Sequence, residues 1–460
     1  MIGCFSLAEL VAVLDGRLAG GDGSEISIDR VSTDTRRIQP GDLFVALRGE
    51  HFDAHDFVAQ AQSLGAVAAV VERLLPLAIP QLVVADSRLA LGAIAHYNRT
   101  FFAGTLVAVT GSSGKTTVKE MLATILAAAG PTLATRGNLN NDIGVPLTLF
   151  ELEQRHRYAV IEMGASGPGE IDYVSGLARP DVAVLNNAFG AHLEGFGSLA
   201  GVVRAKGEIF NGLNAGGTAV VNADDLHADH WLQQLQGRNV LSFGLDRSDV
   251  DVTATGLFLQ SNACHGFELV VGEQRIAVRL QVLGRHNVTN ALAAAAAAVA
   301  AGLDLAAIGR GLEQFEAVPG RMKPRLGVAG CRVIDDSYNA NPASVRAAID
   351  VLAGLPGERV LVLGDMAELG ADAALQHAEV GAYAAAAGIE RFYATGPLCR
   401  HAVAAYRSKG GANGLDFASR TELTSTLNTL AHAQLTLLVK GSRSAAMDQV
   451  VTGLTEGESH

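Results

Sequence analysis

A glycine-rich turn between a short apolar run and a helical pattern constrains this chain more than any other feature. Residues 106–110 are typical of a buried strand, and residues 118–129 have the spacing of a helix. Between them stands Thr110-Gly-Ser-Ser-Gly-Lys-Thr-Thr117. Glycines let backbone N–H groups converge on one point, and the helix N-terminus adds partial positive charge there. The segment therefore predicts a phosphate-binding loop at the edge of a parallel sheet.

The residue types in this turn match those that hold a nucleoside triphosphate. A lysine at position 115 can reach the terminal phosphates, and the hydroxyl of Thr116 can hold Mg²⁺. The general pattern GxxxxGK[ST] has glycine where this chain has Val109, so a plain glycine turn is the alternative. The residues expected to contact the phosphates of ATP are Gly111, Ser112, Ser113, Gly114, Lys115, Thr116 and Thr117.

The order of apolar runs predicts an α/β protein of three domains. A chain of 460 residues is too long for one ordinary core. Strand-like runs alternate with helical patterns twice, which favours two parallel sheets with covered faces. The first set is 106–110, 158–163, 182–185 and 218–222; the second is 332–334, 360–363, 392–394 and 435–439.

The expected domains follow from these sets of strands. Residues 1–84 form a small mixed α/β N-terminal domain that ends in the buried run 81–85. Residues 85–315 form the central domain with the phosphate loop, and its segment 250–282 alternates like an antiparallel appendage. Residues 316–460 form a Rossmann-like C-terminal domain.

Composition excludes several classes of protein. The net charge of -12 argues against a general nucleic-acid or anionic-membrane surface. Four scattered cysteines form no CxxC pair and suit a reducing cytoplasm. The start of the chain lacks the features of a signal peptide. The alanine-rich run 291–301 is too short and too weakly apolar for a membrane span, so we expect a packed helix.

Three further residues of the central domain could belong to the site. Glu162 ends an apolar strand and could bind Mg²⁺, although a solvated strand-end carboxylate is as common. His192 follows another strand, and a lone histidine is more often a structural hydrogen-bonding residue. Lys206 lies on an amphipathic segment, where the ordinary position for a lysine is in solvent.

Taken in order, these motifs resemble those of the Mur ligases along essentially the whole chain. Beyond the phosphate loop, the resemblance rests on Gly137-Asn-Leu-Asn-Asn141, Glu162-Met-Gly164, His192, Ala205-Lys206, Gly284-Arg-His-Asn-Val-Thr-Asn290, Pro319-Gly-Arg-Met322, Asp335-Asp-Ser-Tyr-Asn-Ala-Asn-Pro342, Gly364-Asp-Met-Ala-Glu-Leu-Gly370 and Val439-Lys-Gly-Ser-Arg443. The 335–342 and 364–370 blocks resemble the members that add D-alanyl-D-alanine to a nucleotide-linked cell-wall peptide. The blocks 32–36, 40–47 and 52–57 resemble the nucleotide-sugar-binding domain of those members, with Thr35 and Ala54 as departures.

The resemblance implies an ADP-forming ligase of bacterial peptidoglycan synthesis. Its substrates would be ATP, UDP-N-acetylmuramoyl-tripeptide and D-alanyl-D-alanine, and its intermediate an acyl phosphate. It implies a cytoplasmic protein, usually a monomer, that binds no nucleic acid and is not embedded in a membrane. The tripeptide's third residue, diaminopimelate or lysine, stays open.

The resemblance also implies roles for individual residues. Lys115, Glu162, His192 and Lys206 would be catalytic, with two Mg²⁺ ions held by Thr116, Glu162, His192 and a carbamylated Lys206. Asn287 would lie near adenine, Asp336 at the ribose, and Arg321 at a phosphate. Residues implied to contact the other substrates are Thr35, Arg36, Asn138, Asn141, Tyr338, Asn339 and Asn341.

Three alternatives remain. One is another ligase of the superfamily, either diaminopimelate- or lysine-adding or a folylpolyglutamate synthase; the Asp-Asn-Pro-Arg block of the diaminopimelate-adding enzyme does not occur here. Another is a nucleotide-dependent switch or motor, and a third is a binding protein with an inactive ATP site.

Overall fold

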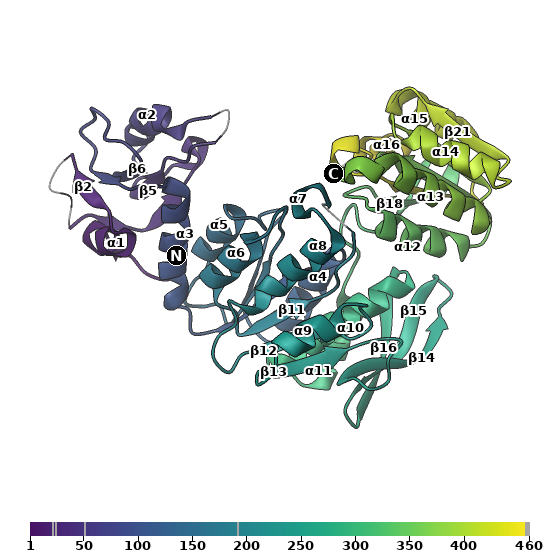
Figure 1. The fold of residues 1–460 in the computed structure, drawn as a ribbon, viewed down its shortest axis with the longest axis horizontal. Coiled ribbons are helices and arrows are strands. Elements are labelled where there is room, and N and C mark those ends of the chain that lie inside the picture. Colours follow the sequence, from purple (N-terminus) through teal and green to yellow (C-terminus); the bar gives the residue numbers. More distant parts are fainter. Residues whose placement is uncertain (21–22, 24, 50–51, 191–192, 456–460) are drawn as a thin grey trace.

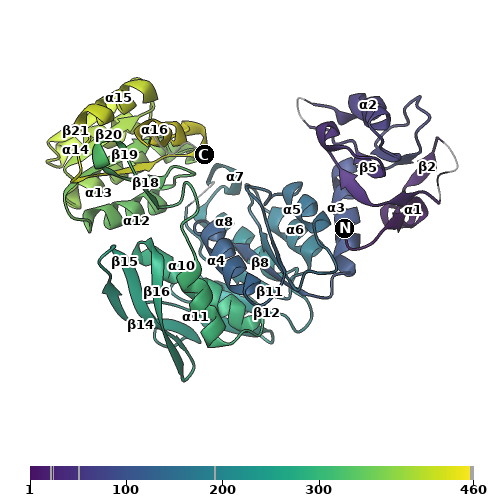
Figure 2. The same cartoon turned by 180° about the vertical axis from the view of Figure 1, so that it is seen from behind.

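The chain forms three units in a row. The computed structural model describes residues 1–20, 23, 25–49, 52–190 and 193–455. The N-terminal and C-terminal units lie at opposite ends of the molecule with the central unit between them (Figure 1). The view from behind shows the same arrangement (Figure 2). Any site shared by two units therefore lies at one end of the central unit.

The N-terminal unit is a small mixed sheet with two helices. Five strands form this sheet in the order β2-β7-β6-β5-β4, with β2 antiparallel to β7 and the other pairs parallel, and β1 and β3 form a separate antiparallel pair. The first helix starts at a capping box formed by Ser6 and Glu9. The elements are β1 (Phe5–Ser6), α1 (Leu7–Leu14), β2 (Arg17–Ala19), β3 (Ser27–Ile28), β4 (Arg30–Ser32), η1 (Thr35–Arg37), β5 (Asp42–Val45), η2 (Ala54–Phe57), α2 (Val58–Ser63), β6 (Ala68–Val71) and β7 (Gln81–Val83).

The central unit is built on a nine-stranded sheet. Its order is β16-β15-β14-β13-β12-β11-β8-β10-β9, parallel from β9 to β14 and antiparallel from β14 to β16. The central strands are apolar and buried on both faces, as a covered parallel sheet requires. The strands are β8 (Thr105–Thr110), β9 (Thr132–Ala134), β10 (Tyr158–Glu162), β11 (Val182–Leu185), β12 (Thr218–Asn222), β13 (Asn239–Phe243), β14 (Val252–Leu259), β15 (Cys264–Val271) and β16 (Gln274–Leu283).

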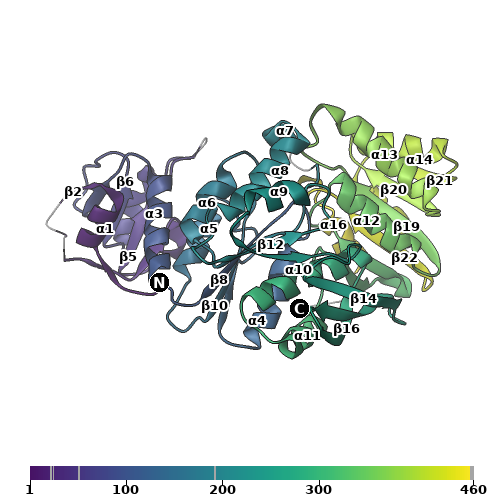
Figure 3. The same cartoon turned by 60° about the horizontal axis from the view of Figure 1, so that its bottom comes forward.

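Helices cover both faces of this sheet. One face packs against α4, α10 and α11. These three helices lie together in the lower middle of Figure 3. The expected packed helix is confirmed, because the alanines at 291–298 are fully buried in α10. The helices are α3 (Ser87–Thr100), α4 (Lys115–Ala127), α5 (Gly144–Phe150), α6 (Glu170–Ala178), α7 (Leu193–Phe196), α8 (Leu199–Gly207), η3 (Glu208–Phe210), α9 (Ala228–Gln234), α10 (Arg285–Ala300) and α11 (Leu305–Gln314).

The C-terminal unit repeats the doubly wound plan with six strands. Its order is β17-β18-β22-β19-β20-β21, and only β17 is antiparallel to its neighbour. Helices α12 to α14 pack on one face, and α15 and α16 on the other. The elements are β17 (Lys323–Leu326), η4 (Val328–Gly330), β18 (Arg332–Asp336), α12 (Pro342–Ala353), β19 (Glu358–Gly364), η5 (Gly370–Asp372), α13 (Ala373–Ala386), β20 (Arg391–Thr395), α14 (Cys399–Ser408), β21 (Asn413–Phe417), α15 (Arg420–Leu430), β22 (Leu435–Lys440), η6 (Arg443–Ala445) and α16 (Asp448–Leu454).

The expected fold class, α/β with a mixed N-terminal unit and two largely parallel sheets, is confirmed. The antiparallel appendage is also confirmed, as strands β14 to β16. Within the described residues, no helix combines the length and the apolarity needed to cross a membrane.

Candidate active site

A cavity of about 830 Å³ lies between the central and C-terminal units. The carboxyl ends of parallel strands from both sheets open into it, which is where ligands bind in doubly wound folds. Glu162 and Asn222 line it at the ends of β10 and β12, and Asp336 and Lys440 at the ends of β18 and β22. The cavity is thus lined by the strand ends of both the central and the C-terminal sheet.

The glycine-rich turn forms the floor of this cavity between β8 and α4. The helix begins at Lys115 rather than at Val118, because Gly114 (φ 78°) takes the left-handed conformation that ends the turn. A Cβ at Gly114 would also collide with the side-chain amides of Asn186 and Asn290. Glycine is therefore required here on both backbone and packing grounds.

Two asparagines at the end of β11 hold the turn in shape. The N–H of Ser112 donates to the carbonyl of Asn187 at 3.0 Å, and the N–H of Ser113 donates to Asn187 Oδ1 at 2.9 Å. Asn186 Nδ2 donates to the Ser113 carbonyl at 3.0 Å and to Asn290 Oδ1 at 3.0 Å. Asn290 in turn donates to Asn287 at 2.8 Å. A chain of buried amides thus links the phosphate loop to the residue expected near adenine.

A carboxylate lies beside the first turn of α4. Glu162 is 2% exposed, and its two oxygens accept from Thr116 Oγ1 and from Asn140 Nδ2, each at 2.9 Å. Lys115 Nζ donates to the Gly111 carbonyl at 2.8 Å. Burial lowers the pKa of Lys115, and the nearby Glu162 charge opposes that shift. The hydroxyl and the carboxylate are hard oxygen donors of the kind that Mg²⁺ prefers.

Lys206 lies in an unusual position for a lysine. It is 2% exposed on α8, which rules out the solvated position that is ordinary for a lysine, and its Nζ lies 5.3 Å from the centre of the Phe196 ring. Burial, together with the positive charge of Lys115, lowers the pKa of Lys206 to about 7. An appreciable fraction of the amine is therefore neutral at physiological pH.

The C-terminal wall is held by a buried ion pair. Lys440 Nζ lies 2.6 Å from Asp336 Oδ2 and donates to the Asn339 carbonyl at 2.9 Å. The N–H of Met322 donates to Asp336 Oδ1 at 3.2 Å. Burial raises the pKa of Asp336, and the Lys440 charge opposes that shift. Asp336 ends strand β18 and does not belong to a surface turn, so turn chemistry does not account for it.

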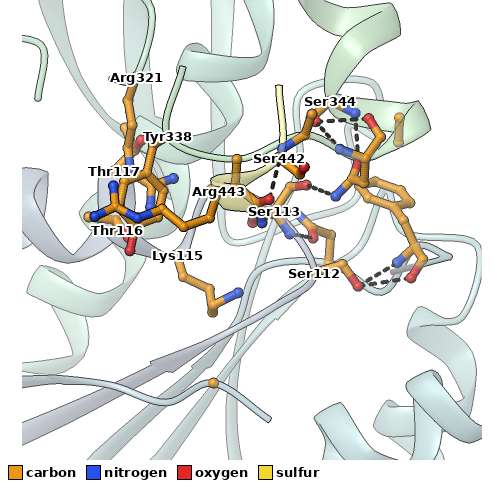
Figure 4. A pocket seen from close by; sticks show the side chains of 18 of the residues that line it. Ser112, Ser113, Lys115, Thr116, Thr117, Arg321, Tyr338, Ser344, Ser442 and Arg443 are labelled. Atoms are coloured by element: carbon orange, nitrogen blue, oxygen red, sulfur yellow. Dashed lines mark hydrogen bonds between the residues drawn. The ribbon is translucent and has the colours of Figure 1, made fainter. Parts of the chain in front are cut away.

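Two arginines of this wall share one aromatic ring. The guanidinium carbon of Arg321 lies 4.3 Å from the centre of the Tyr338 ring, and that of Arg443 lies 5.5 Å from it. Figure 4 shows the three side chains grouped on one side of the cavity above Lys115.

Among the described residues, one hydrogen bond joins the central and C-terminal units across the cavity. Asn341 Nδ2 donates to Ser113 Oγ at 3.2 Å. Asn341 is also the N-cap of α12, where its side-chain oxygen accepts from the Ser344 N–H. The start of α12 is therefore already in contact with the phosphate loop.

Comparison with known proteins shows matches in all three units. Residues 27–97 match the Mur ligase family catalytic domain, residues 109–298 the Mur ligase middle domain, and residues 320–443 the Mur ligase glutamate ligase domain. The chain belongs to the Mur ligase family.

Relatives and solved structures agree with this assignment. The UDP-N-acetylmuramoyl-tripeptide–D-alanyl-D-alanine ligase of Escherichia coli is 49% identical over 98% of both chains, and that of Bacillus subtilis 32% over 98% of both. A crystal structure of MurF from Acinetobacter baumannii has a TM-score of 0.93 at 39% identity, covering 99% of this chain and 100% of that one. MurF ligase from Thermotoga maritima, solved with ADP, has a TM-score of 0.81 at 28% identity, covering 92% and 96%.

The structure brings most of the expected Mur ligase site residues together. The cavity lining includes Ser112, Ser113, Gly114, Lys115, Thr116, Thr117, Asn138, Asn141, Glu162, Asn287, Arg321, Asp336, Tyr338, Asn339 and Asn341. Gly111 and Lys206 are not part of the lining, although the Lys206 ammonium is close enough to be affected by the charge of Lys115. His192 lies outside the described residues.

Thr35 and Arg36 lie far from this cavity, in η1 of the N-terminal unit. The Arg36 side chain is largely exposed and forms an ion pair with Asp34 at 2.8 Å. Their expected contact with the nucleotide sugar stays a prediction.

The sequence prediction missed several residues that shape the site. They are Asn140, Asn186, Asn187, Asn290, Lys440 and Arg443. Most of them lay inside the motifs that indicated the family, but only their spatial partners distinguish them from ordinary polar residues.

A cluster of Asp365, His377 and Cys399 resembles a metal site but has another explanation. Each nitrogen of the buried His377 ring already has a partner, the Met366 N–H at 3.0 Å and the Ala373 carbonyl at 2.7 Å. Asp365 accepts from the Cys399 N–H at 2.8 Å. The cluster therefore anchors the loop that follows β19 and leaves no ring nitrogen for an ion.

Proposed function

We propose that this chain uses ATP to join D-alanyl-D-alanine to the terminal carboxyl of UDP-N-acetylmuramoyl-tripeptide. The observation that supports this most is the pairing of Thr116 and Glu162 beside the phosphate loop, in a cavity that Arg321 and Asp336 of the C-terminal unit also line. Two units then contribute groups to one triphosphate. The names of relatives that match over nearly the full length favour the D-alanyl-D-alanine acceptor over the diaminopimelate- or lysine-adding reaction.

The chemistry begins with a carboxylate, which is a poor acyl donor because its leaving group would be oxide. A carboxylate oxygen attacks the γ-phosphorus of ATP, the bond to ADP breaks, and an acyl phosphate forms. The amine of the dipeptide then attacks the acyl carbon, inorganic phosphate leaves, and the amine proton passes to solvent or phosphate. Catalysis therefore consists largely of positioning and of neutralising negative charge.

The described residues provide the groups for the phosphoryl step. Lys115 and the N–H groups at the start of α4 would bind the β- and γ-phosphates. The Thr116 hydroxyl and the Glu162 carboxylate fit Mg²⁺, which when bound would neutralise phosphate charge. Arg321 would approach a phosphate from the C-terminal unit, and Asp336 would accept hydrogen bonds from ribose hydroxyls.

Lys206 would serve a second Mg²⁺ site only after modification, because an ammonium cannot ligate a cation. Its neutral amine attacks CO₂, one proton is released, and the resulting carbamate presents anionic oxygens. A buried amine whose pKa is lowered to about 7 supports this reaction, since the nucleophilic form is available at neutral pH. His192 would be the partner ligand implied by the family.

The N-terminal unit would bind the uridine diphosphate, with Thr35 and Arg36 as candidate contacts. Asn138 and Asn141 would lie near the tripeptide, and Tyr338, Asn339 and Asn341 near the dipeptide. Closure of the units would exclude water from the acyl phosphate.

The test is phosphate release with ATP, Mg²⁺ and UDP-N-acetylmuramoyl-tripeptide, with and without D-alanyl-D-alanine. We expect turnover that requires the dipeptide and yields one ADP per amide. Equal phosphate release without any amine would instead support a nucleotide-dependent switch, and dependence on a different amine would support another ligase of the superfamily.

A further inference from the structure

Arg443 lines the cavity without a described role in the reaction. It is the first residue of η6, just past the end of β22, and its side chain is exposed toward the cavity. Its contact is with the Tyr338 ring, 5.5 Å from the ring centre. In the described part of the chain, no carboxylate pairs with its guanidinium, so the charge is available to a ligand.

The other lysines and arginine in the cavity lining already have partners or are placed near the nucleotide. Lys440 is paired with Asp336, and Lys115 bonds to the phosphate loop. Arg321 lies next to Asp336, the residue expected at the ribose, because the N–H of the adjacent Met322 donates to Asp336 Oδ1 at 3.2 Å. Among the lysines and arginines that line the cavity, Arg443 is therefore the one available to bind an anion other than the triphosphate.

The acceptor brings such an anion into the cavity. D-alanyl-D-alanine attacks through its amine, while its terminal carboxylate takes no part in the bond changes and stays charged. A charge that is enclosed when the units close must be paired. We propose that Arg443 binds this terminal carboxylate, an inference that rests on the proposed function and adds the residue that recognises the free acid.

The surroundings of Arg443 suit that task. A guanidinium offers two parallel N–H donors that match the two oxygens of a carboxylate, and stacking on Tyr338 restricts its orientation before the ligand arrives. Ser442 and Ser444, its neighbours in the chain, also line the cavity and present neutral hydroxyl groups. Tyr338, expected at the acceptor, is thus also the surface against which the arginine rests.

The experiment compares two acceptors, D-alanyl-D-alanine and D-alanyl-D-alaninamide, with the wild type and with Arg443→Gln. We expect wild-type kcat/KM to fall about 100-fold with the amide, because a hydrogen-bonded charge pair is lost. In Arg443→Gln, kcat/KM with D-alanyl-D-alanine should also fall about 100-fold. Its kcat/KM values for the two acceptors should then differ less than fivefold, and its KM for ATP should be unchanged. Arg443→Lys should retain intermediate discrimination, since it keeps the charge without the fork.

Two controls separate the possible outcomes. Arg321→Gln should raise the KM for ATP and keep the wild-type ratio of kcat/KM between the acid and the amide. Arg346 lies outside the cavity lining, so Arg346→Gln should change neither the KM for ATP nor that ratio. If Arg443→Gln still discriminates about 100-fold, or raises only the KM for ATP, the assignment is wrong. Absence of wild-type turnover with either acceptor would instead count against the proposed function itself.

Discussion

Removing the Lys440 ammonium should destabilise the C-terminal unit locally and strongly. Lys440 and Asp336 lie at neighbouring ends of β22 and β18, their side chains are 4% and 12% exposed, and the ion pair measures 2.6 Å. The perturbation is Lys440→Met, which keeps the length of the side chain and removes its charge. Asp336 would then be a buried carboxylate without its counter-ion.

The magnitude follows from the burial of both partners. Removing one member of a buried pair costs about 3–5 kcal/mol, because the remaining charge is left uncompensated. Each 1.4 kcal/mol is a factor of ten. The opening equilibrium at the ends of β18 and β22 should therefore shift by about two to four orders of magnitude.

Amide hydrogen exchange of the full chain measures this shift where it occurs. Unfolding of three units is not a two-state process, and the single tryptophan, Trp231, reports on the central unit alone. We expect exchange at the carboxyl ends of β18 and β22 to accelerate about 100-fold or more, with β8 and β10 unchanged. Lys409→Met, an exposed lysine at the end of α14, should leave every segment as in the wild type.

The double variant Lys440→Met/Asp336→Asn decides whether the uncompensated charge is the cause. With the carboxylate gone as well, most of the protection should return. If the single and double variants exchange equally fast, lost packing rather than charge explains the effect and the reasoning is refuted.

The same defect should depend on pH. In Lys440→Met, burial should hold the pKa of Asp336 further above its ordinary 3.8 than in the wild type, where Lys440 opposes that shift. Consider pH values between 3.8, the ordinary pKa of Asp336, and its higher pKa in the folded variant. In this range the folded protein binds more protons than the unfolded one, so the free energy of unfolding falls as pH rises. The variant should therefore approach the wild type below pH 3.8 and show its full defect at neutral pH.

Three further predictions concern the catalytic cycle. Lys206→Ala should abolish turnover, and added formate or acetate should partly restore it; full activity without additives would contradict a carbamate ligand. Isotope trapping should show ATP binding before the nucleotide-peptide and the dipeptide last, and productive trapping of the dipeptide on enzyme without ATP would overturn that order. Asn341→Ser keeps the cap of α12 but is too short to reach Ser113, so kcat should fall severalfold, as in Asn341→Ala. Amide exchange in the first turn of α12 should accelerate only in the alanine variant. Equal kcat in Asn341→Ser and the wild type would show that the contact with Ser113 is incidental.

Local patterns in the sequence predicted the parts of the fold whose signals are continuous along the chain. The strands that surround the phosphate loop are buried on both faces, so they stand out as apolar runs. Strands β13 and β21 were missed because neither is a continuous buried apolar run: β13 starts exposed and is partly buried over its next three positions, β21 has three exposed positions, and both include polar residues. Their assignment depends on the neighbouring strand, which a local window does not contain.

The site shows the same division between local and spatial information. Lys115 and Thr116 follow from one contiguous segment, and Glu162 from its place at a strand end. Lys440 does not, because a lysine after an apolar strand is ordinarily solvated. It becomes the partner of Asp336 only because β22 lies between β18 and β19, an order that the sequence does not reveal.

The cations in the cavity and Lys206 beside it differ in what surrounds their charged groups, and these surroundings fit the partner expected for each. Burial lowers the pKa of Lys115 and of Lys206, so both depend on a neighbouring anion or can lose their proton. Arg321 and Arg443 rest on an aromatic ring, and among the described residues neither forms an ion pair with a carboxylate. A ring orients a guanidinium without neutralising it, whereas an ion pair such as that of Lys440 would have to be broken before an anion could bind. Tyr338 therefore orients both guanidinium groups of the C-terminal wall and leaves their charge available for the phosphate and the carboxylate that we propose they bind.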